Sequence, residues 1–272
     1  MKAGRQTIGV FDSGFGGLTV LRALLPRLPG SHFLYLGDTA RLPYGDKSRA
    51  TVARYAIEAA QFLVARGAHL LVIACNTATA LALPEIRAAV PVPVIGVVEP
   101  GARAALALAA THENAEVLVL ATAATVQSHA YRDTCAALGL QAAEKPCPLL
   151  VPLVEEGWTD HPVTRDVLRI YLREALASTT PCAVLLGCTH YPLIAAEVAT
   201  VLHELGCNAA IVDSAQATAE AVCAALPTSP VLNEQPATFE CFATDSVEKF
   251  ARLGSRFLGR EIPHVELLDL GG

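Results

Sequence analysis

The sequence lacks two features that would point to a large partner: a block of basic residues and a long apolar run. Its 20 Lys and Arg are outnumbered by 26 Asp and Glu, giving a net charge of −6, and this balance argues against a nucleic-acid partner. No apolar stretch reaches the roughly 18–20 residues that a membrane helix requires, and residues 1–7 show no apolar signal region. We therefore expect a cytoplasmic protein that binds a small molecule and has neither nucleic acid nor membrane as a partner.

Paired cysteines are also lacking. The eight cysteines are Cys75, Cys135, Cys147, Cys182, Cys188, Cys207, Cys223 and Cys241. No two of them are spaced as Cys-x-x-Cys, which argues against a zinc ribbon or a thioredoxin-type redox centre. We expect no metal site. In a reducing compartment most of these side chains should be small buried hydrophobic groups.

Charged residues are scarce, at 17%, whereas hydrophobic residues make up 53% of the 272 residues, enough for a large core. Short apolar runs rich in Val, Ile and Leu alternate with helical patterns, which is typical of parallel sheets covered by helices on both faces. The expected fold class is therefore α/β. The predicted strands are Thr7–Phe11, Phe33–Leu36, Leu70–Ala74, Val94–Val97, Val117–Leu120, Ala183–Leu186, Ala210–Val212 and Thr238–Phe242. The predicted helices are Leu18–Leu28, Arg49–Arg66, Pro100–Ala110, Ser128–Leu138, Thr164–Ala177, Leu193–Leu205, Ala215–Leu226 and Ser246–Leu258.

No low-complexity linker divides the chain, but one pattern occurs twice. Residues 70–77 form an apolar run that ends in Cys75 and a polar pair, and residues 183–190 form another that ends in Cys188. The two cysteines are 188 − 75 = 113 positions apart, about one domain length. We expect two similar lobes, each a mostly parallel sheet flanked by helices, with the active site between them. Residues 1–98 and 210–272 should form the first lobe, and residues 99–209 the second.

Both cysteines are expected at the carboxyl end of a strand, just before a helix. Ligands of open α/β sheets bind at this edge, and the positive end of the helix favours a thiolate there. His190 follows Cys188 by two residues, so in an extended chain both side chains would face the same way and could exchange a proton. Asn76, Thr77 and Thr189 offer polar groups for an amino or carboxylate group.

Two further loops should reach the same edge. Asp12 and Ser13 precede a Gly-rich turn that lacks the third glycine of a dinucleotide-binding loop, since Thr19 stands in its place. Backbone N–H groups of such a turn can still bind a carboxylate. The second loop carries Asp38, which could support the site or only cap a turn, and then Tyr44-Gly45.

Two thiols facing one ligand suit the inversion of a stereocentre, because one base removes a proton while an acid returns one on the opposite face. An unperturbed thiol, with a pKa of about 8.5, can serve in either role. The usual cofactor for amino-acid racemisation is pyridoxal phosphate on a lysine. Only four lysines are present, and none has an apolar sequence context. The sequence therefore favours a reaction without a cofactor.

These motifs resemble glutamate racemase in order and spacing, over nearly the whole chain. The matching segments are Phe11–Gly17, Gly37–Gly45, Ala74–Ala80 and Leu186–Pro192, with Val98–Gly101, Val154–Gly157 and Asp245–Phe250 in addition. The resemblance implies a bacterial enzyme that interconverts L- and D-glutamate without a cofactor and supplies D-glutamate for peptidoglycan. It also suggests a homodimer. The related aspartate racemases usually carry Glu after Cys-Thr, so His190 favours glutamate.

The resemblance also implies individual roles. Cys75 would take the α-proton of D-glutamate, assisted by Asp12, and Cys188 that of L-glutamate, assisted by His190. Asp38 and Glu155 would support them. The substrate would be held by Asp12, Ser13, Tyr44, Gly45, Asn76, Thr77, Thr189 and His190, with Thr122 and Thr125 reaching its side-chain carboxylate. One departure from the family is Ala124, where glycine is usual; if that glycine supplies a positive φ, alanine would strain the loop.

Three other interpretations remain open from the residues. Cys188 and His190 could form a thiol hydrolase in which Cys75 is an inert core residue. The two lobes could close on an amino acid without chemistry. Cys75, Cys188 and His190 could hold a metal, although their spacing is unlike common zinc motifs.

Overall fold

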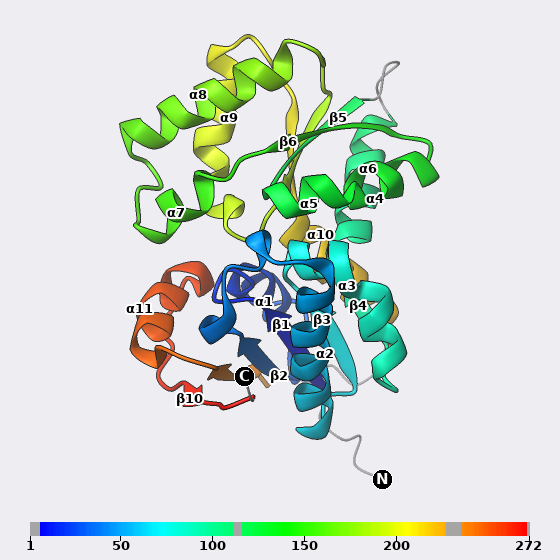
Figure 1. Cartoon of the computed structure of the whole chain (residues 1–272), viewed down its shortest axis with the longest axis vertical. Helices are drawn as coiled ribbons and strands as arrows, with labels where there is room; N and C mark the ends of the chain where they lie inside the picture. Colours follow the sequence, from blue (N-terminus) through cyan, green and yellow to red (C-terminus); the bar gives the residue numbers. More distant parts are fainter. Residues whose placement is uncertain (1–5, 111–115, 227–234, 271–272) are drawn as a thin grey trace.

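The computed structural model describes residues 6–110, 116–226 and 235–270, and these form two lobes, each built around one parallel sheet (Figure 1). The first sheet has the order β10-β9-β2-β1-β3-β4 and the second the order β6-β5-β7-β8. Every pairing is parallel. The predicted α/β class with two lobes is confirmed.

Each of the eight predicted strands is present. The strands are β1 (Thr7–Asp12), β2 (His32–Gly37), β3 (Leu70–Ile73), β4 (Val94–Gly96), β5 (Glu116–Ala121), β6 (Gln141–Pro146), β7 (Ala183–Gly187), β8 (Ala210–Asp213), β9 (Thr238–Ala243) and β10 (Glu266–Leu267). Two were not predicted. β6 is an edge strand that carries Glu144, Lys145 and Pro146, so it shows no apolar pattern, and β10 has only two residues.

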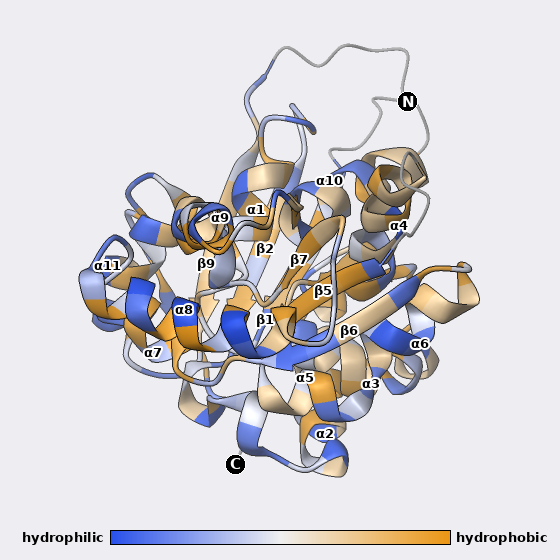
Figure 2. Cartoon of the chain, turned by 90° about the horizontal axis from the view of Figure 1, so that it is seen from above, coloured by the Kyte–Doolittle hydropathy of each residue, from blue (hydrophilic) through white to orange (hydrophobic). Residues whose placement is uncertain are grey.

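Helices connect the strands and cover the sheets. They are α1 (Leu18–Leu24), α2 (Arg49–Ala65), α3 (Asn76–Ala89), α4 (Val98–Ala109), α5 (Ala123–Ser128), α6 (Ala130–Ala137), α7 (Leu150–Glu155), α8 (Pro162–Leu176), α9 (Ala195–Glu204), α10 (Ser214–Ala225) and α11 (Val247–Leu258), with short 3₁₀ turns η1 (Thr39–Arg41), η2 (Tyr44–Asp46) and η3 (Tyr191–Ile194). Seen from above, strands β5 and β7 are strongly apolar between helices with polar outer faces (Figure 2). Within the described ranges, no helix is both long and apolar enough to cross a membrane.

The expected boundary at residue 210 differs from the observed pairing. β8 (Ala210–Asp213) pairs with β7 and so belongs to the second sheet. The chain returns to the first sheet only with β9, and α10 between them packs against both α1 and α4. The sequence does not say which sheet β8 joins, because the strand has just four residues and its apolar pattern fits either sheet. We propose that the second lobe extends to Asp213.

The strands direct their carboxyl ends toward the space between the lobes. One hydrophobic core cluster contains Val10 of the first sheet and Val184 of the second, so apolar packing is continuous beneath this space. The first turn of α1 contacts the second lobe. There Thr19 Oγ1 donates a hydrogen bond to the backbone oxygen of Thr189, at 3.1 Å. The two strand-end loops therefore lie against one another.

Candidate active site

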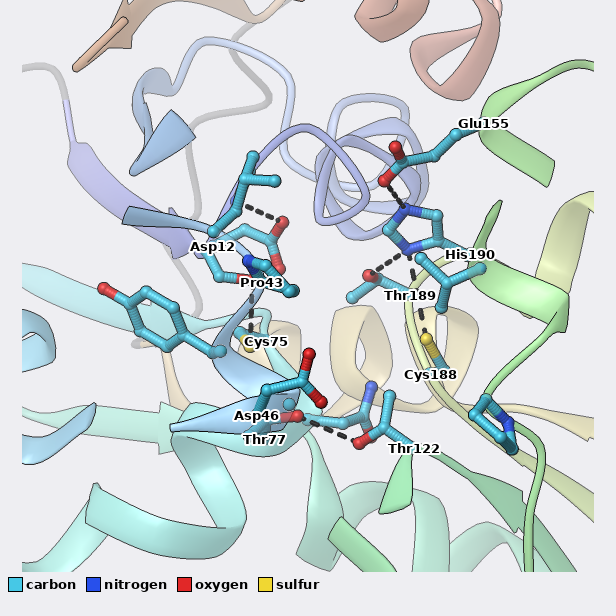
Figure 3. A pocket seen from close by; sticks show the side chains of 18 of the residues that line it. Asp12, Pro43, Asp46, Cys75, Thr77, Thr122, Glu155, Cys188, Thr189 and His190 are labelled. Atoms are coloured by element: carbon cyan, nitrogen blue, oxygen red, sulfur yellow. Dashed lines mark hydrogen bonds and ion pairs between the residues drawn. The ribbon is translucent and has the colours of Figure 1, made fainter. Parts of the chain in front are cut away.

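A cavity of about 220 Å³ lies between the lobes at the carboxyl ends of the strands. It brings together twelve of the fourteen predicted site residues: Asp12, Ser13, Tyr44, Gly45, Cys75, Asn76, Thr77, Thr122, Glu155, Cys188, Thr189 and His190. Asp38 and Thr125 are buried behind its wall. Cys75 and Cys188 lie on opposite sides of the cavity (Figure 3).

Cys75 caps the N-terminus of α3, directly after β3. Its sulfur accepts a hydrogen bond from the backbone N–H of Ala78 (3.4 Å), and its thiol donates to Ser13 Oγ (3.5 Å). Burial and the negative charge of Asp12 raise the pKa of Cys75 to about 12, outweighing the hydrogen bonds from Ser13 and Ala78. The expectation that the helix terminus favours a thiolate at Cys75 is therefore wrong for this structure, because desolvation is the larger effect.

Asp12 ends β1 beside Cys75 and is almost fully buried. Its Oδ2 accepts a hydrogen bond from the backbone N–H of Gly14 at 3.0 Å. Burial raises the pKa of Asp12, partly offset by the backbone N–H groups and the charge of His190. Its second oxygen, Oδ1, is buried without a partner in the described part of the chain. A ligand in the cavity with a hydrogen-bond donor would satisfy it.

Cys188 follows β7 and contacts His190. Their Sγ and Nδ1 atoms lie 3.9 Å apart, and His190 Nε2 lies 3.2 Å from Glu155 Oε1 (Figure 3). Burial lowers the pKa of His190, but hydrogen bonds and charge from Cys188 and Glu155 outweigh burial and raise it to about 10. The chain at His190 is helical rather than extended, so a turn, not strand alternation, produces the expected contact.

Two phenylalanines that sequence reasoning missed hold the imidazole in place. The ring of Phe257, from α11, lies edge-on to His190 with centroids 4.9 Å apart. Phe15 lies 6.1 Å from His190 and 5.5 Å from Phe257, centroid to centroid. Both belong to the first lobe, whereas His190 belongs to the second. No sequence signal pointed to Phe257, because it is brought to the site only by the folding of α11.

Asp38 acts on the site through its neighbours. Its carboxylate accepts hydrogen bonds from Arg41 Nε (2.8 and 3.0 Å), Tyr44 OH (2.5 Å) and Thr244 Oγ1 (2.9 Å). Arg41 also pairs with Glu58. This network fixes the phenol of Tyr44 at the cavity wall, and a supporting role for Asp38 stays a prediction.

Three threonine hydroxyls meet where the lobes approach. Thr77 Oγ1, from the first lobe, lies 3.1 Å from Thr122 Oγ1 and 3.3 Å from Thr125 Oγ1, both from the second. Thr122 caps α5 through the N–H of Thr125. Ala124 lies in the first turn of this helix and has no positive φ, so the expected strain does not arise.

A carboxylate in the cavity would have to be bound by hydrogen-bond donors rather than by a lysine or arginine. Among the described residues that line it, none is Lys or Arg. Asn76 and Thr77, the first residues of α3, line the cavity, and backbone N–H groups at a helix N-terminus can bind a carboxylate. The reactive side chains that line the cavity are two thiols, one imidazole and the three carboxylates of Asp12, Asp46 and Glu155. Within the residues that the structure covers, no group of His, Cys, Asp and Glu is placed to hold a metal ion.

Comparison with known proteins gives the family. The family model described as Asp/Glu/Hydantoin racemase matches residues 16–222. The glutamate racemase of Koribacter versatilis is 50% identical to this chain and is aligned over all of both sequences. That of Syntrophus aciditrophicus is 45% identical over 97% of this chain and 96% of its own.

Solved structures agree. The glutamate racemase isoform RacE1 from Bacillus anthracis superimposes with a TM-score of 0.89 at 34% identity, covering 97% of this chain and 98% of its own. The enzyme from Francisella tularensis, solved in complex with D-glutamate, gives a TM-score of 0.85 at 33% identity and covers 98% of each chain. The chain therefore belongs to the Asp/Glu/hydantoin racemase family and, within it, to the glutamate racemases.

Proposed function

We propose that this protein interconverts L- and D-glutamate by transferring protons at the α-carbon between two thiols, Cys75 and Cys188, without a cofactor. The observation that carries the proposal is that both thiols line one cavity from opposite lobes, each at the end of a parallel strand. A substrate between them would have one sulfur on each face of its α-carbon. The D-glutamate bound to the Francisella tularensis enzyme supports the choice of substrate.

The polar groups of the cavity define the expected arrangement of the substrate. Its ammonium group would donate to the free Oδ1 of Asp12, which is buried beside Cys75. Its α-carboxylate would accept from Asn76 and the N–H groups at the start of α3, and its side-chain carboxylate from the hydroxyls of Thr77 and Thr122. Ser13, Tyr44, Gly45 and Thr189 complete the wall, and Thr125 acts through its contact with Thr77.

The reaction then needs two proton transfers and no change of oxidation state. Starting from L-glutamate, the thiolate of Cys188 takes the α-proton, and the C–H electron pair remains on the α-carbon and the adjoining carboxylate. The thiol of Cys75 gives its proton to the opposite face. D-glutamate leaves, with Cys188 protonated and Cys75 a thiolate; starting from D-glutamate, the same steps run in reverse. Hydrogen bonds to the carboxylate stabilise the charge that develops in the transition state.

The neighbours of each thiol suit these roles. A protonated His190, held by Glu155, stabilises negative charge on the sulfur of Cys188. At Cys75, burial and Asp12 favour the neutral thiol. A substrate ammonium on Asp12 would cancel that negative charge and make the thiolate of Cys75 accessible.

This geometry supports the proposal over two alternatives. A Cys188–His190 hydrolase gives Cys75 no role, whereas Cys75 lines the same cavity. A binding protein without chemistry would need no acid–base partner beside Cys188. Both remain testable, since each predicts that glutamate keeps its α-proton.

The biological setting follows from the family resemblance. We propose that the protein works in the cytoplasm, supplies D-glutamate for peptidoglycan, and forms a homodimer. Light scattering of the purified protein would test the dimer, and D-glutamate auxotrophy after gene deletion would test the supply.

Proton NMR in D2O tests the proposed reaction directly. Purified protein without added cofactor is incubated with either enantiomer of glutamate. We expect loss of the α-proton signal together with decay of optical activity. Exchange with aspartate alone would change the substrate, and no exchange with either amino acid in folded, reduced protein would overturn the proposal.

A further inference from the structure

Tyr131 makes a buried hydrogen bond between the lobes that neither the sequence motifs nor the proposed reaction uses. Its phenol donates to Oδ1 of Asn76 at 2.6 Å. Tyr131 lies on α6 in the second lobe, and Asn76 is the first residue of α3 in the first lobe. Tyr131 does not line the cavity, whereas Asn76 does.

The phenol ring is held firmly in position. Tyr131 is fully buried. A Cβ added at Gly187 would lie 3.0 Å from one edge of the ring, and one added at Gly101 would lie 3.5 Å from the other edge. Burial raises the pKa of Tyr131, so the phenol remains a hydrogen-bond donor across the working pH range. The hydroxyl therefore points at Asn76 from a fixed site.

This hydrogen bond decides how the Asn76 amide is turned. A carboxamide has an oxygen that accepts and an NH2 group that donates. With the oxygen held by Tyr131, the NH2 group is what remains for a ligand. Asn76 is 3% exposed, and its Nδ2 is buried with no partner in the described chain. An unpaired buried donor is costly unless a ligand satisfies it.

We propose that Tyr131 is a positioning residue that orients the Asn76 amide so that its NH2 group donates to a carboxylate of the bound amino acid. The inference rests on the proposed function for the identity of that ligand. A residue of the second lobe thus orients a substrate-binding side chain of the first lobe. Without the phenol hydroxyl the amide can turn over, and its oxygen then faces the carboxylate and repels it.

A double-mutant cycle tests the inference. Tyr131→Phe, Asn76→Ala and the double variant are compared with the wild type for kcat/KM. Their affinity for D-glutamate is compared by calorimetry with Cys188→Ala added to every protein, so that the ligand is not converted. We expect Tyr131→Phe alone to weaken binding and lower kcat/KM by about tenfold or more, as for a lost hydrogen bond to a charged group. In the Asn76→Ala background the same change should alter neither quantity by more than about twofold.

The control is Tyr191→Phe, because Tyr191 is equally buried and donates instead to the backbone oxygen of Cys147 at 3.0 Å. It should lose stability as Tyr131→Phe does but keep its affinity for D-glutamate. Additive effects in the cycle, or unchanged affinity in Tyr131→Phe, would overturn the inference. A wild type that binds glutamate but does not turn it over would instead refute the proposed function, while the affinity cycle still decides the role of Tyr131. A wild type that does not bind glutamate overturns both.

A second measurement needs no Tyr131 variant and covers the case in which Tyr131→Phe does not fold. The side-chain NH2 signal of Asn76 in a proton–nitrogen correlation spectrum is assigned by its loss in Asn76→Ala. Adding D-glutamate to the wild type should shift that signal as the NH2 group gains an acceptor. An unmoved Asn76 signal at saturating D-glutamate would contradict the inference.

Discussion

The imidazole Nδ1 of His190 lies 3.9 Å from the sulfur of Cys188. Cys75, on the other side of the cavity, instead has the hydroxyl of Ser13 at 3.5 Å and the carboxylate of Asp12 nearby. Both cysteines follow a buried parallel strand, but Cys75 caps α3 directly, whereas Cys188 is followed by the short turn η3. The two thiols also differ in the group that lies beside each of them. The pair is therefore asymmetric: one thiol lies beside an imidazole and the other beside a hydroxyl and a carboxyl group.

Replacing either thiol should stop racemisation, since each face of the α-carbon needs its own acid or base. We expect Cys75→Ser and Cys188→Ser each to lower turnover of both enantiomers by at least about a hundredfold. A coupled assay for each enantiomer measures this. Cys223→Ser is the control, because Cys223 is partly buried, lies outside the cavity, and donates to the backbone oxygen of Arg27. Retained turnover in either active-site variant would refute the two-thiol reaction.

Asp12→Asn should make the thiolate of Cys75 easier to form and yet slow the reaction. Removing the negative charge should lower the pKa of Cys75 from about 12, since Asp12 raises it. Racemisation should fall about tenfold or more, because the substrate ammonium loses its charged partner. The rate of Cys75 alkylation against pH, measured in a Cys188→Ala background, reports the first effect.

Asp213→Asn is the matched control, because Asp213 also ends a strand and is partly buried but lies outside the cavity. Its carboxylate caps α10 through the N–H of Ala215, and an asparagine can do the same. It should leave Cys75 alkylation unchanged. An alkylation profile that does not move in Asp12→Asn would show that Asp12 does not control this thiol.

Much of this site could be predicted from the sequence, because ligands of parallel sheets bind at the carboxyl ends of the strands. Strands such as β3 and β7 are short, wholly buried apolar runs, so their ends and the cysteines after them can be placed from the pattern alone. The edge strand β6 has charged residues and gave no such signal.

What could not be predicted depends on contacts between distant segments. Phe257 reaches His190, and Tyr131 reaches Asn76, only because helices from different parts of the chain pack at the same place. The same holds for the pKa of Cys75, which depends on how completely the lobes bury it. No local motif carries that information.

His190 gives the folding stability a defined pH dependence. The pKa of His190 is raised to about 10 in the folded protein, whereas an unfolded histidine has a pKa of about 6.5. The folded state therefore binds the proton more tightly, and the stabilisation is complete below about pH 6.5 and lost as pH rises toward 10. We expect the excess free energy of unfolding of the wild type over His190→Gln to shrink from pH 6 to pH 10 in urea titrations. A difference that grows with pH would contradict the raised pKa.

Ala124→Gly tests whether the family's usual glycine is needed here. Ala124 lies in the first turn of α5 without a positive φ, so a glycine there would relieve no backbone strain. It would lose more conformational entropy on folding than alanine does. We expect a loss of roughly 0.5–1 kcal/mol in the free energy of unfolding, with kcat/KM unchanged. Calorimetric unfolding and a racemase assay measure the two. An increase in both the free energy of unfolding and kcat/KM would show that alanine strains this loop.

Gly16→Ala should disable the site while leaving the fold intact. A Cβ at Gly16 would lie 2.3 Å from Thr189 Oγ1 and 2.6 Å from the His190 ring, so the loop that carries Cys188 would have to move. A shift of about 1 Å at reacting groups can cost on the order of a hundredfold in rate, and we expect a loss of kcat of that size. Gly206→Ala is the control: at φ 76° with nothing within 4 Å of its Cβ, it strains only the backbone. It should lose stability but keep kcat, whereas equal kcat in both variants would show that the contact of Gly16 with the Thr189–His190 loop does not set the geometry of catalysis.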